Sequence, residues 1–403
     1  MTTRRTFLKT GAAAAATLAT GAWPARADNA PGVTDTEIKI GQTMPYSGPA
    51  SAYGVIGKTE AAYFKMINEA GGINGRKINL VSLDDAYSPP KTVEQVRRLV
   101  EQENVAFFFN TLGTAPNAAI RQYLNDNKIP QLFVSTGASM FADPEHFPWT
   151  MGFNPNYQTE ARIYAKHILQ TKPDAKIGVL YQNDGFGKDY LIGLKAVLGA
   201  DHAGMIVKEA SYETSEPTID SQVVSLQGSG ADVFIIAATP KFAAQAVRKS
   251  YDLGWTPVRY ISNVSPSIAT VLKPAGLEKS KGLITAYYGK DPTDKRWADD
   301  AGLKAWKDFT TKYMTATDFT DANASYGFSA AGTLVHVLKQ CGNDLSRENI
   351  LKQAASVKDL QLPMMLPGQL INTSPTNYSP IRQMQLATFD GASWELFGEL
   401  ITG

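Results

Sequence analysis

Residues 105–134, VAFFFNTLGTAPNAAIRQYLNDNKIPQLFV, contain two apolar runs separated by a loop and an amphipathic stretch. The runs at 105–109 and 129–134 have the length and apolar character of buried strands, and residues 116–125 have the spacing of a helix. Near-continuous apolar strands are typical of a parallel sheet that helices cover on both faces. This segment therefore predicts an α/β fold built from strand–helix–strand units.

The same alternation continues on both sides of this segment. Before it, strands are predicted at 38–40 and 78–83 and helices at 58–68 and 89–102. After it the alternation restarts, with strands at 177–181, 205–211, 233–237 and 259–262 and helices at 163–170, 190–198, 219–227 and 242–253. The pattern ends with helices at 303–314, 325–341 and 347–355 and strands at 383–389 and 394–397. A chain of 403 residues can bury two cores, so we expect two consecutive doubly wound units that meet along a cleft.

The N-terminus has the three parts of a secretory signal. Arg4, Arg5 and Lys9 precede a weakly apolar run at 11–23, and a small-residue stretch ends at Ala27. Paired arginines are typical of a twin-arginine signal, and the run is too short and too rich in Ala and Gly to span ~30 Å of hydrocarbon. The alternatives are an amphipathic first helix or a membrane anchor. We expect cleavage near Ala27, loss of residues 1–27 and a mature protein in the periplasm.

The charge balance and the cysteine count exclude several classes of function. Lys and Arg total 39 against 38 Asp and Glu, and removal of the signal leaves 35 basic and 38 acidic side chains, a formal charge of −3. A nearly neutral chain has no electrostatic basis for binding nucleic acid. The single cysteine, Cys341, permits neither an internal disulfide nor a dithiol or thiolate metal site within a monomer.

The motifs of enzymes and cofactor sites are incomplete in this sequence. His146, His167, His202 and His336 lack the spacing of metal ligands, and no Gly-x-Ser-x-Gly sequence of a hydrolase nucleophile occurs. Residues 185–187 read Gly-Phe-Gly, but the third glycine of a dinucleotide fingerprint is missing. The sequence therefore predicts a protein with no catalytic residues, no metal and no cofactor.

Five stretches together resemble a known family. These are GQTMPYSGP at 41–49 followed by Tyr53-Gly54, INEAGGING at 67–75, Asp84-Asp85, PQLFVSTGA at 130–138 and YQNDGFG at 181–187. In this order and spacing they resemble type I periplasmic solute-binding proteins of ABC importers, in particular the leucine/isoleucine/valine-binding protein family. The resemblance covers nearly the whole mature chain.

This resemblance implies a fold, a division into lobes and a set of partners. Two doubly wound parallel-sheet lobes would be joined by a three-segment hinge and close on a ligand. Lobe 1 would comprise residues 34–155 and 286–358, and lobe 2 residues 156–285 and 359–403. The implied partners are a small carboxylate ligand and ABC permease subunits in the inner membrane, and we expect a monomer.

Two loops at the carboxyl ends of predicted strands have residues that suit a carboxylate. Residues 110–114 and 135–139 each offer small side chains, backbone N–H groups and a hydroxyl at a helix start. By resemblance, Thr114, the backbone of Ala138 and Ser139 would hold the ligand carboxylate. The alternative is that Thr114 and Ser139 only cap helices.

The sequence departs from the family at the position that binds an amine. In amino-acid-binding members an acidic residue just after the strand that ends here at 261–262 pairs with the ligand ammonium, whereas this chain has Asn263 and Val264. A desolvated ammonium without a counter-charge costs several kcal/mol. This departure favours an aromatic or branched aliphatic acid without an amine over a branched-chain amino acid. The alternative is that Asp184 or another acid reaches the amine.

Further side chains are expected to shape an apolar pocket. They are Tyr53, Tyr157 and Phe186, with Thr239 and Val264 in the second lobe; simple packing is the alternative for the two tyrosines. The leading hypothesis is a periplasmic binding component of an ABC importer, which performs no chemistry. Two other hypotheses remain open at this point: a ligand-sensing module for a membrane receptor, and an exported cofactor enzyme, which the twin-arginine signal motivates.

Overall fold

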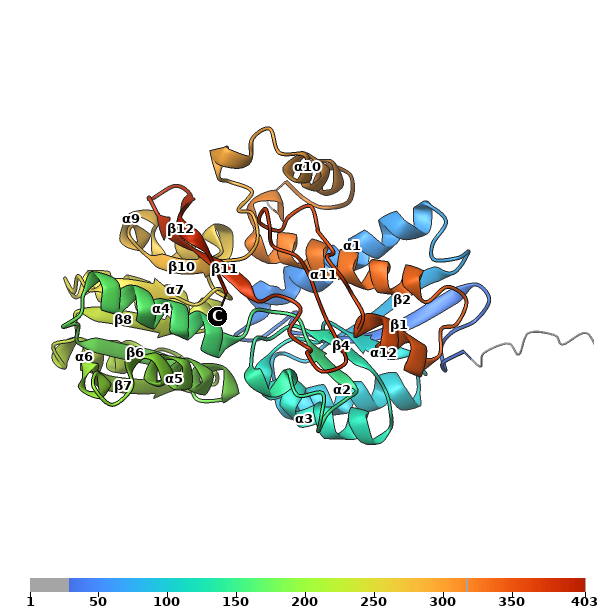
Figure 1. Cartoon of the computed structure of the whole chain (residues 1–403), viewed down its shortest axis with the longest axis horizontal. Helices are drawn as coiled ribbons and strands as arrows, with labels where there is room; N and C mark the ends of the chain where they lie inside the picture. Colours follow the sequence, from blue (N-terminus) through green and yellow to red (C-terminus); the bar gives the residue numbers. More distant parts are fainter. Residues whose placement is uncertain (1–28, 317, 403) are drawn as a thin grey trace, which may run out of the picture.

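The computed structural model describes residues 29–316 and 318–402, which form two α/β lobes side by side along the long axis of the molecule (Figure 1). The export signal expected at residues 1–27 lies outside the described residues. Each lobe contains one sheet in which most strand pairs are parallel. The predicted fold class is therefore confirmed.

The first sheet has five parallel strands in the order β2-β1-β3-β4-β5. Its strands are β1 (Glu37–Met44), β2 (Lys77–Asp84), β3 (Phe107–Phe109), β4 (Gln131–Val134) and β5 (Thr150–Gly152). The helices of this lobe are α1 (Gly54–Glu69), α2 (Pro89–Glu101), α3 (Thr114–Asp126), α11 (Ala322–Gln340) and α12 (Arg347–Ala354). Side chains of β3 alternate between two cores: Phe108 packs with α2 and α3, whereas Phe107 and Phe109 pack with α1 and α11.

The second sheet has seven strands in the order β12-β11-β10-β9-β8-β6-β7. These are β6 (Ile177–Gln182), β7 (Ile206–Tyr212), β8 (Val233–Ala237), β9 (Val258–Ile261), β10 (Ile284–Tyr287), β11 (Gln383–Phe389) and β12 (Trp394–Thr402). α4 (Tyr157–Thr171) and α5 (Gly185–Leu198) cover one face, and α6 (Asp220–Gly228) and α7 (Pro240–Asp252) cover the other. β11 and β12 run antiparallel because a short turn joins them, so this lobe is not purely parallel.

The chain passes between the lobes three times: after β5, after β10 and after α12. Two short helices, α8 (Lys273–Ala275) and α9 (Leu277–Ser280), follow β9. The longer helix α10 (Ala301–Tyr313) follows β10 and packs beside α1. The lobe boundaries expected at residues 155, 285 and 358 stay a prediction. Within the described ranges, no helix combines the length and apolar character needed to cross a bilayer.

The structure adds elements that the sequence pattern did not predict. β5 and β10 were missed because their short sequences, Thr-Met-Gly and Ile-Thr-Ala-Tyr, lack the continuous apolar character that indicates β3, Phe-Phe-Phe. α4 begins at Tyr157, earlier than the expected residue 163. The side chain of Asn156 accepts hydrogen bonds from the backbone N–H groups of Gln158 and Thr159, which fixes this earlier start.

The close packing of α4 on α5 generates a stability prediction. A Cβ at Gly193 would lie 2.4 Å from the carbonyl oxygen of Gln158 and 2.7 Å from the Cβ of Ala161. Gly193→Ala should therefore lower the free energy of unfolding by about 1–3 kcal/mol, although alanine is the better helix former. Gly228→Ala at the end of α6 is the matched control, because nothing lies within 4 Å of its Cβ position. Urea unfolding of both variants measures the effect; equal changes in the two would contradict the packing argument.

Candidate functional site

A cavity lies between the lobes, at the carboxyl ends of strands from both sheets. Its lining residues follow β3 (Leu112, Gly113, Thr114), β4 (Ser135), β5 (Phe153, Asn154), β8 (Thr239), β9 (Asn263, Val264) and β10 (Tyr288, Gly289). The centres of water-sized molecules can occupy about 80 Å³ of the cavity. This is room for several waters or a small organic molecule. Ligands of open α/β sheets bind at this end of the strands.

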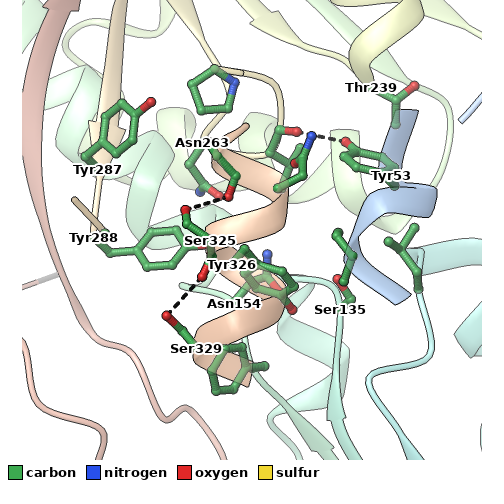
Figure 2. A pocket seen from close by; sticks show the side chains of 18 of the residues that line it. Tyr53, Ser135, Asn154, Thr239, Asn263, Tyr287, Tyr288, Ser325, Tyr326 and Ser329 are labelled. Carbon is green, nitrogen blue, oxygen red and sulfur yellow. Dashed lines mark hydrogen bonds between the residues drawn. The ribbon is translucent and has the colours of Figure 1, made fainter. Parts of the chain in front are cut away.

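Eight aromatic side chains line the cavity. They are Tyr53, Tyr87, Phe153, Tyr157, Phe186, Tyr287, Tyr288 and Tyr326. Figure 2 shows α11 running through the site with Ser325, Tyr326 and Ser329, while Tyr53 lies on one side and Tyr287 and Tyr288 on the other. The rings of Tyr157 and Phe186 pack with their centroids 4.7 Å apart. Such a wall suits the apolar body of a ligand.

The N-terminus of α3 supplies one polar end of the cavity. Gly113 precedes the helix with a φ of +100°, and a Cβ there would lie 2.5 Å from the Tyr87 ring, so only glycine fits. Over the described residues no side chain caps the first turn of α3, which leaves its amides for another partner. Thr114 lines the cavity, and its hydroxyl shares a 2.7 Å hydrogen bond with that of Thr136. A helix start of this kind favours an anion.

Ala138 and Ser139, the other residues expected to hold the carboxylate, do not line the cavity. The N–H and hydroxyl of Ser139 donate to the carboxylate of Asp189 at 2.6 and 2.9 Å. The amide of Gln158 also donates to Asp189, at 2.8 Å. The Ala138 N–H donates to the Thr136 hydroxyl at 3.2 Å. Donors of the loop after β4 are thus bound to a carboxylate of the protein itself, on α5 of the opposite lobe.

Two further hydrogen bonds join the lobes beside the cavity. The Tyr53 hydroxyl donates to the carbonyl oxygen of Val264 at 2.9 Å, and the Gln182 amide donates to the Tyr87 hydroxyl at 3.3 Å. The structure therefore describes a closed arrangement of the lobes.

The remaining sequence-predicted residues also reach the cavity. Tyr53, Tyr157, Phe186, Thr239 and Val264 all line it. Thr239 stands at the start of α7, and its N–H donates to the Tyr212 hydroxyl at 3.0 Å. Six of the eight expected residues are therefore brought together. Whether they bind a ligand stays a prediction.

No aspartate or glutamate of the described residues lines the cavity. Asp184, the acid considered as a substitute, caps α5 and accepts hydrogen bonds from the Phe186 N–H and the Gln182 amide. Among the described residues, the charged residue that lines the cavity is Lys290, whose ammonium pairs with the Asp300 carboxylate at 2.6 Å. The described residues also contain no group of three His, Cys, Asp or Glu side chains placed to hold a metal ion.

One acid, Glu160, lies directly behind the cavity wall. Its fully buried carboxyl accepts hydrogen bonds from the hydroxyls of Tyr164 and Tyr190 and from the backbone N–H and side-chain amide of Asn263. Desolvation by burial outweighs these donors and raises the pKa of Glu160 to about 7. The acid therefore contacts the wall residue Asn263, not the cavity.

Sequence reasoning missed many of the residues that line the cavity. They include Tyr87, Tyr287, Tyr288, Lys290, Asn323, Ser325, Tyr326, Ser329, Met364 and Met365. Ser325 and Ser329 are four residues apart and so share a helix face, which is the signal that the sequence offers for α11. Tyr287 ends β10, the short strand that the pattern did not indicate, and Tyr288 follows it.

Comparisons with known proteins agree with this architecture. A family model described as "Periplasmic binding protein" matches residues 37–393. The Leu/Ile/Val-binding protein homolog 7 of Brucella suis is 27% identical over 407 aligned residues, which cover 96% of this chain and 94% of that protein. These relatives are binding proteins, not enzymes.

Solved structures share the fold over most of their length. A branched chain amino acid ABC transporter protein from Thermus thermophilus with bound valine has a TM-score of 0.80 at 16% identity, covering 92% of this chain and 98% of that one. A fatty acid ABC transporter substrate-binding protein from Thermomonospora curvata has a TM-score of 0.76 at 21% identity, covering 94% and 96%.

The burial of Glu160 generates a prediction about stability and pH. Between pH 4.5 and about 7 the folded chain keeps the Glu160 proton while the unfolded chain loses it, so stability falls as the pH rises through this window. Glu160 accounts for up to about 3 kcal/mol of this fall in the free energy of unfolding. Urea unfolding measures the free energy of unfolding at pH 5 and pH 8. From pH 5 to pH 8 this free energy should fall less in Glu160→Gln than in the wild type. Glu145→Gln, at an exposed position, is the control, and an unchanged decline in Glu160→Gln would contradict the prediction.

The contact between Ser139 and Asp189 generates a prediction about lobe closure. Asp189→Asn removes the charge that accepts the Ser139 hydrogen bonds, and each such bond contributes about 1.5–3 kcal/mol. The ligand-free variant should therefore open and have a larger radius of gyration in small-angle X-ray scattering than the wild type. Asp201→Asn on the exposed surface serves as the control. Equal radii in the two variants would show that this contact does not hold the lobes.

Proposed function

The chain belongs to the periplasmic binding protein family, and from this premise we propose that it is the solute-binding component of an ABC importer for a small carboxylate. The ligand would be an aromatic or branched aliphatic acid without an amine, and a branched-chain amino acid is the alternative. The protein would bind its ligand in the periplasm by closing the lobes and would release it unaltered to permease subunits in the inner membrane.

The observation that carries the proposal is the unequal chemistry of the cavity. One end has the uncapped start of α3 with Thr114 and Ser135, which suits a carboxylate. Eight aromatic side chains line the rest of the cavity, and no described acid lines it to pair with an ammonium. Enclosing an ammonium there would cost several kcal/mol, whereas an amine-free acid meets no such cost.

The solved relatives support both kinds of ligand for this fold. The Thermus thermophilus protein holds valine, and the Thermomonospora curvata protein is named for fatty acids. The fold therefore accommodates carboxylates with and without an amine, and the lining residues decide between them.

Matched pairs of acids test the proposed ligand class. We expect 4-methylpentanoate and phenylacetate to raise the melting temperature of ligand-freed protein more than leucine and phenylalanine do. A ligand at 100 times its dissociation constant adds about 2.7 kcal/mol of stability, which a thermal-shift assay detects. Stabilisation by leucine or valine but by neither amine-free acid would overturn the preference.

The role of the α3 start is tested at Thr114. Thr114→Ala should weaken the binding of a stabilising acid by about tenfold, because a hydrogen bond to a charged group contributes at least about 1.5 kcal/mol. Isothermal titration calorimetry measures the affinity, and Thr311→Ala on the exposed face of α10 is the control. An unchanged affinity in Thr114→Ala would remove this residue from the site.

A further inference from the structure

Asn154 presents an unused hydrogen-bond donor to the cavity. It lies two residues beyond β5, is half-buried and lines the cavity between the lobes (Figure 2). Its side-chain nitrogen Nδ2 donates to no group of the described residues, and it is not one of the unpaired side-chain atoms that are sealed inside the protein, so it keeps accessible surface. Closure of the lobes removes water from this wall, and the donor then needs an acceptor that a ligand can supply.

A chain of hydrogen bonds from the first lobe sets the orientation of the Asn154 amide. Nδ2 of Asn110 donates to the Tyr326 hydroxyl at 3.0 Å, and this hydroxyl donates to Oδ1 of Asn154 at 2.9 Å. Asn110 is fully buried, and its Nδ2 also donates to the carbonyl oxygen of Phe133 at 2.7 Å. If the Asn154 amide turned over, two N–H donors would meet at the Tyr326 oxygen, and the phenol proton would lose this acceptor. Nδ2 is therefore held as the free end of the amide.

This donor stands in a row with the start of α3. The strands β3, β4 and β5 are neighbours in the first sheet, and beyond them Leu112 pairs with Ser135, while Val134 pairs with Gly152. Neighbouring strands lie about 4.8 Å apart, so the backbone at Asn154 is about two strand spacings from the α3 start. The side chains at both places line the same cavity, which shortens the gap between them. A small acid with its carboxylate at the α3 start can therefore place a second group at Nδ2.

The chemistry of this donor favours a neutral acceptor. An amide nitrogen donates and does not accept, so an ammonium gains nothing from it. A second carboxylate would need a counter-charge, and Lys290, the charged lining residue of the described chain, is already paired with Asp300. A carbonyl oxygen accepts the hydrogen bond without a charge. Resting on the proposed function, we propose that the ligand is an oxo acid whose carbonyl oxygen accepts a hydrogen bond from Asn154 Nδ2, and that Tyr326 is the positioning residue for this amide.

Matched acids with and without a carbonyl test the proposal. Phenylacetate is compared with phenylglyoxylate, 4-methylpentanoate with 4-methyl-2-oxopentanoate, and pentanoate with 4-oxopentanoate, by calorimetry on ligand-freed protein. In the wild type at least one oxo acid should bind about five times tighter than its parent or better, because the parent leaves the enclosed donor unpaired. In Asn154→Leu, which has a side chain of similar size without the donor, this preference should vanish while the affinity for the parent acid changes little.

Two other cavity residues supply the controls. Asn323 lines the same cavity at the start of α11, but its Nδ2 donates to the Thr270 hydroxyl at 3.4 Å. Asn323→Leu should therefore change the affinities for parent and oxo acid by the same factor. Thr114→Ala should also weaken both equally, because the carboxylate is common to both acids. If Asn154→Leu does not fold, Asn154→Ala gives the same comparison.

Tyr326→Phe separates the positioning role of Tyr326 from a structural one. The variant keeps the ring and removes the phenol proton that holds Oδ1 of Asn154. The preference for the oxo acid should fall, whereas a structural role alone would change the affinities for parent and oxo acid by the same factor. Infrared spectra of an oxo acid with a carbon-13 carbonyl add a direct measurement. The carbonyl stretch should lie at lower frequency in the wild-type complex than in the complex with Asn154→Leu, because a hydrogen bond weakens the C=O bond.

The outcomes distinguish this inference from the proposed function. If no oxo acid binds the wild type more tightly than its parent, the role of Asn154 is refuted and the proposed ligand class remains. If the preference persists in Asn154→Leu, another residue donates to the carbonyl and the inference is also refuted. If no acid of either series binds, the proposed function itself fails, and the inference fails with it.

Discussion

Closure of the two lobes removes water from their facing surfaces, and every polar group left there needs a partner on the other side. The protein supplies several of these partners itself: Ser139 donates to Asp189, Tyr53 to the Val264 carbonyl and Gln182 to Tyr87. An unpaired buried group costs about 1–3 kcal/mol. Donors that line the cavity and have no protein partner in the closed form, such as the backbone amides at the start of α3, are therefore the groups that a ligand can satisfy.

This requirement distinguishes the loops at 110–114 and 135–139, which look equivalent in the sequence. The start of α3 keeps uncapped amides, whereas the donors of Ser139 are bound to Asp189 across the lobes. A ligand carboxylate at Ser139 would have to displace a charged side chain that already satisfies two donors. The α3 start offers the same kind of donors without that competition, which supports the proposal that the ligand carboxylate binds at Thr114 and its neighbours.

The sequence predicts the fold and part of the site where these depend on patterns of neighbouring residues. Strand–helix alternation specifies the two sheets, and residues such as Thr114, Thr239 and Val264 reach the cavity because they follow strands whose carboxyl ends converge. The contact of Ser139 with Asp189 joins residues 50 positions apart, and no local pattern encodes it. The same is true of Tyr326 on α11, because the sequence predicts this helix but only tertiary packing places Tyr326 in the cavity wall.

Glu160 shows how a charge can shape a site without entering it. A carboxylate at the wall itself would attract an ammonium directly, whereas one layer behind the wall it accepts hydrogen bonds from the backbone N–H and the side-chain nitrogen of Asn263. Burial makes this arrangement costly, as the pKa of about 7 indicates. Replacing the acid with an apolar residue would remove that cost but would also release the amide. The geometry therefore exchanges stability for a fixed position of Asn263, and it keeps the Glu160 carboxyl out of the cavity lining.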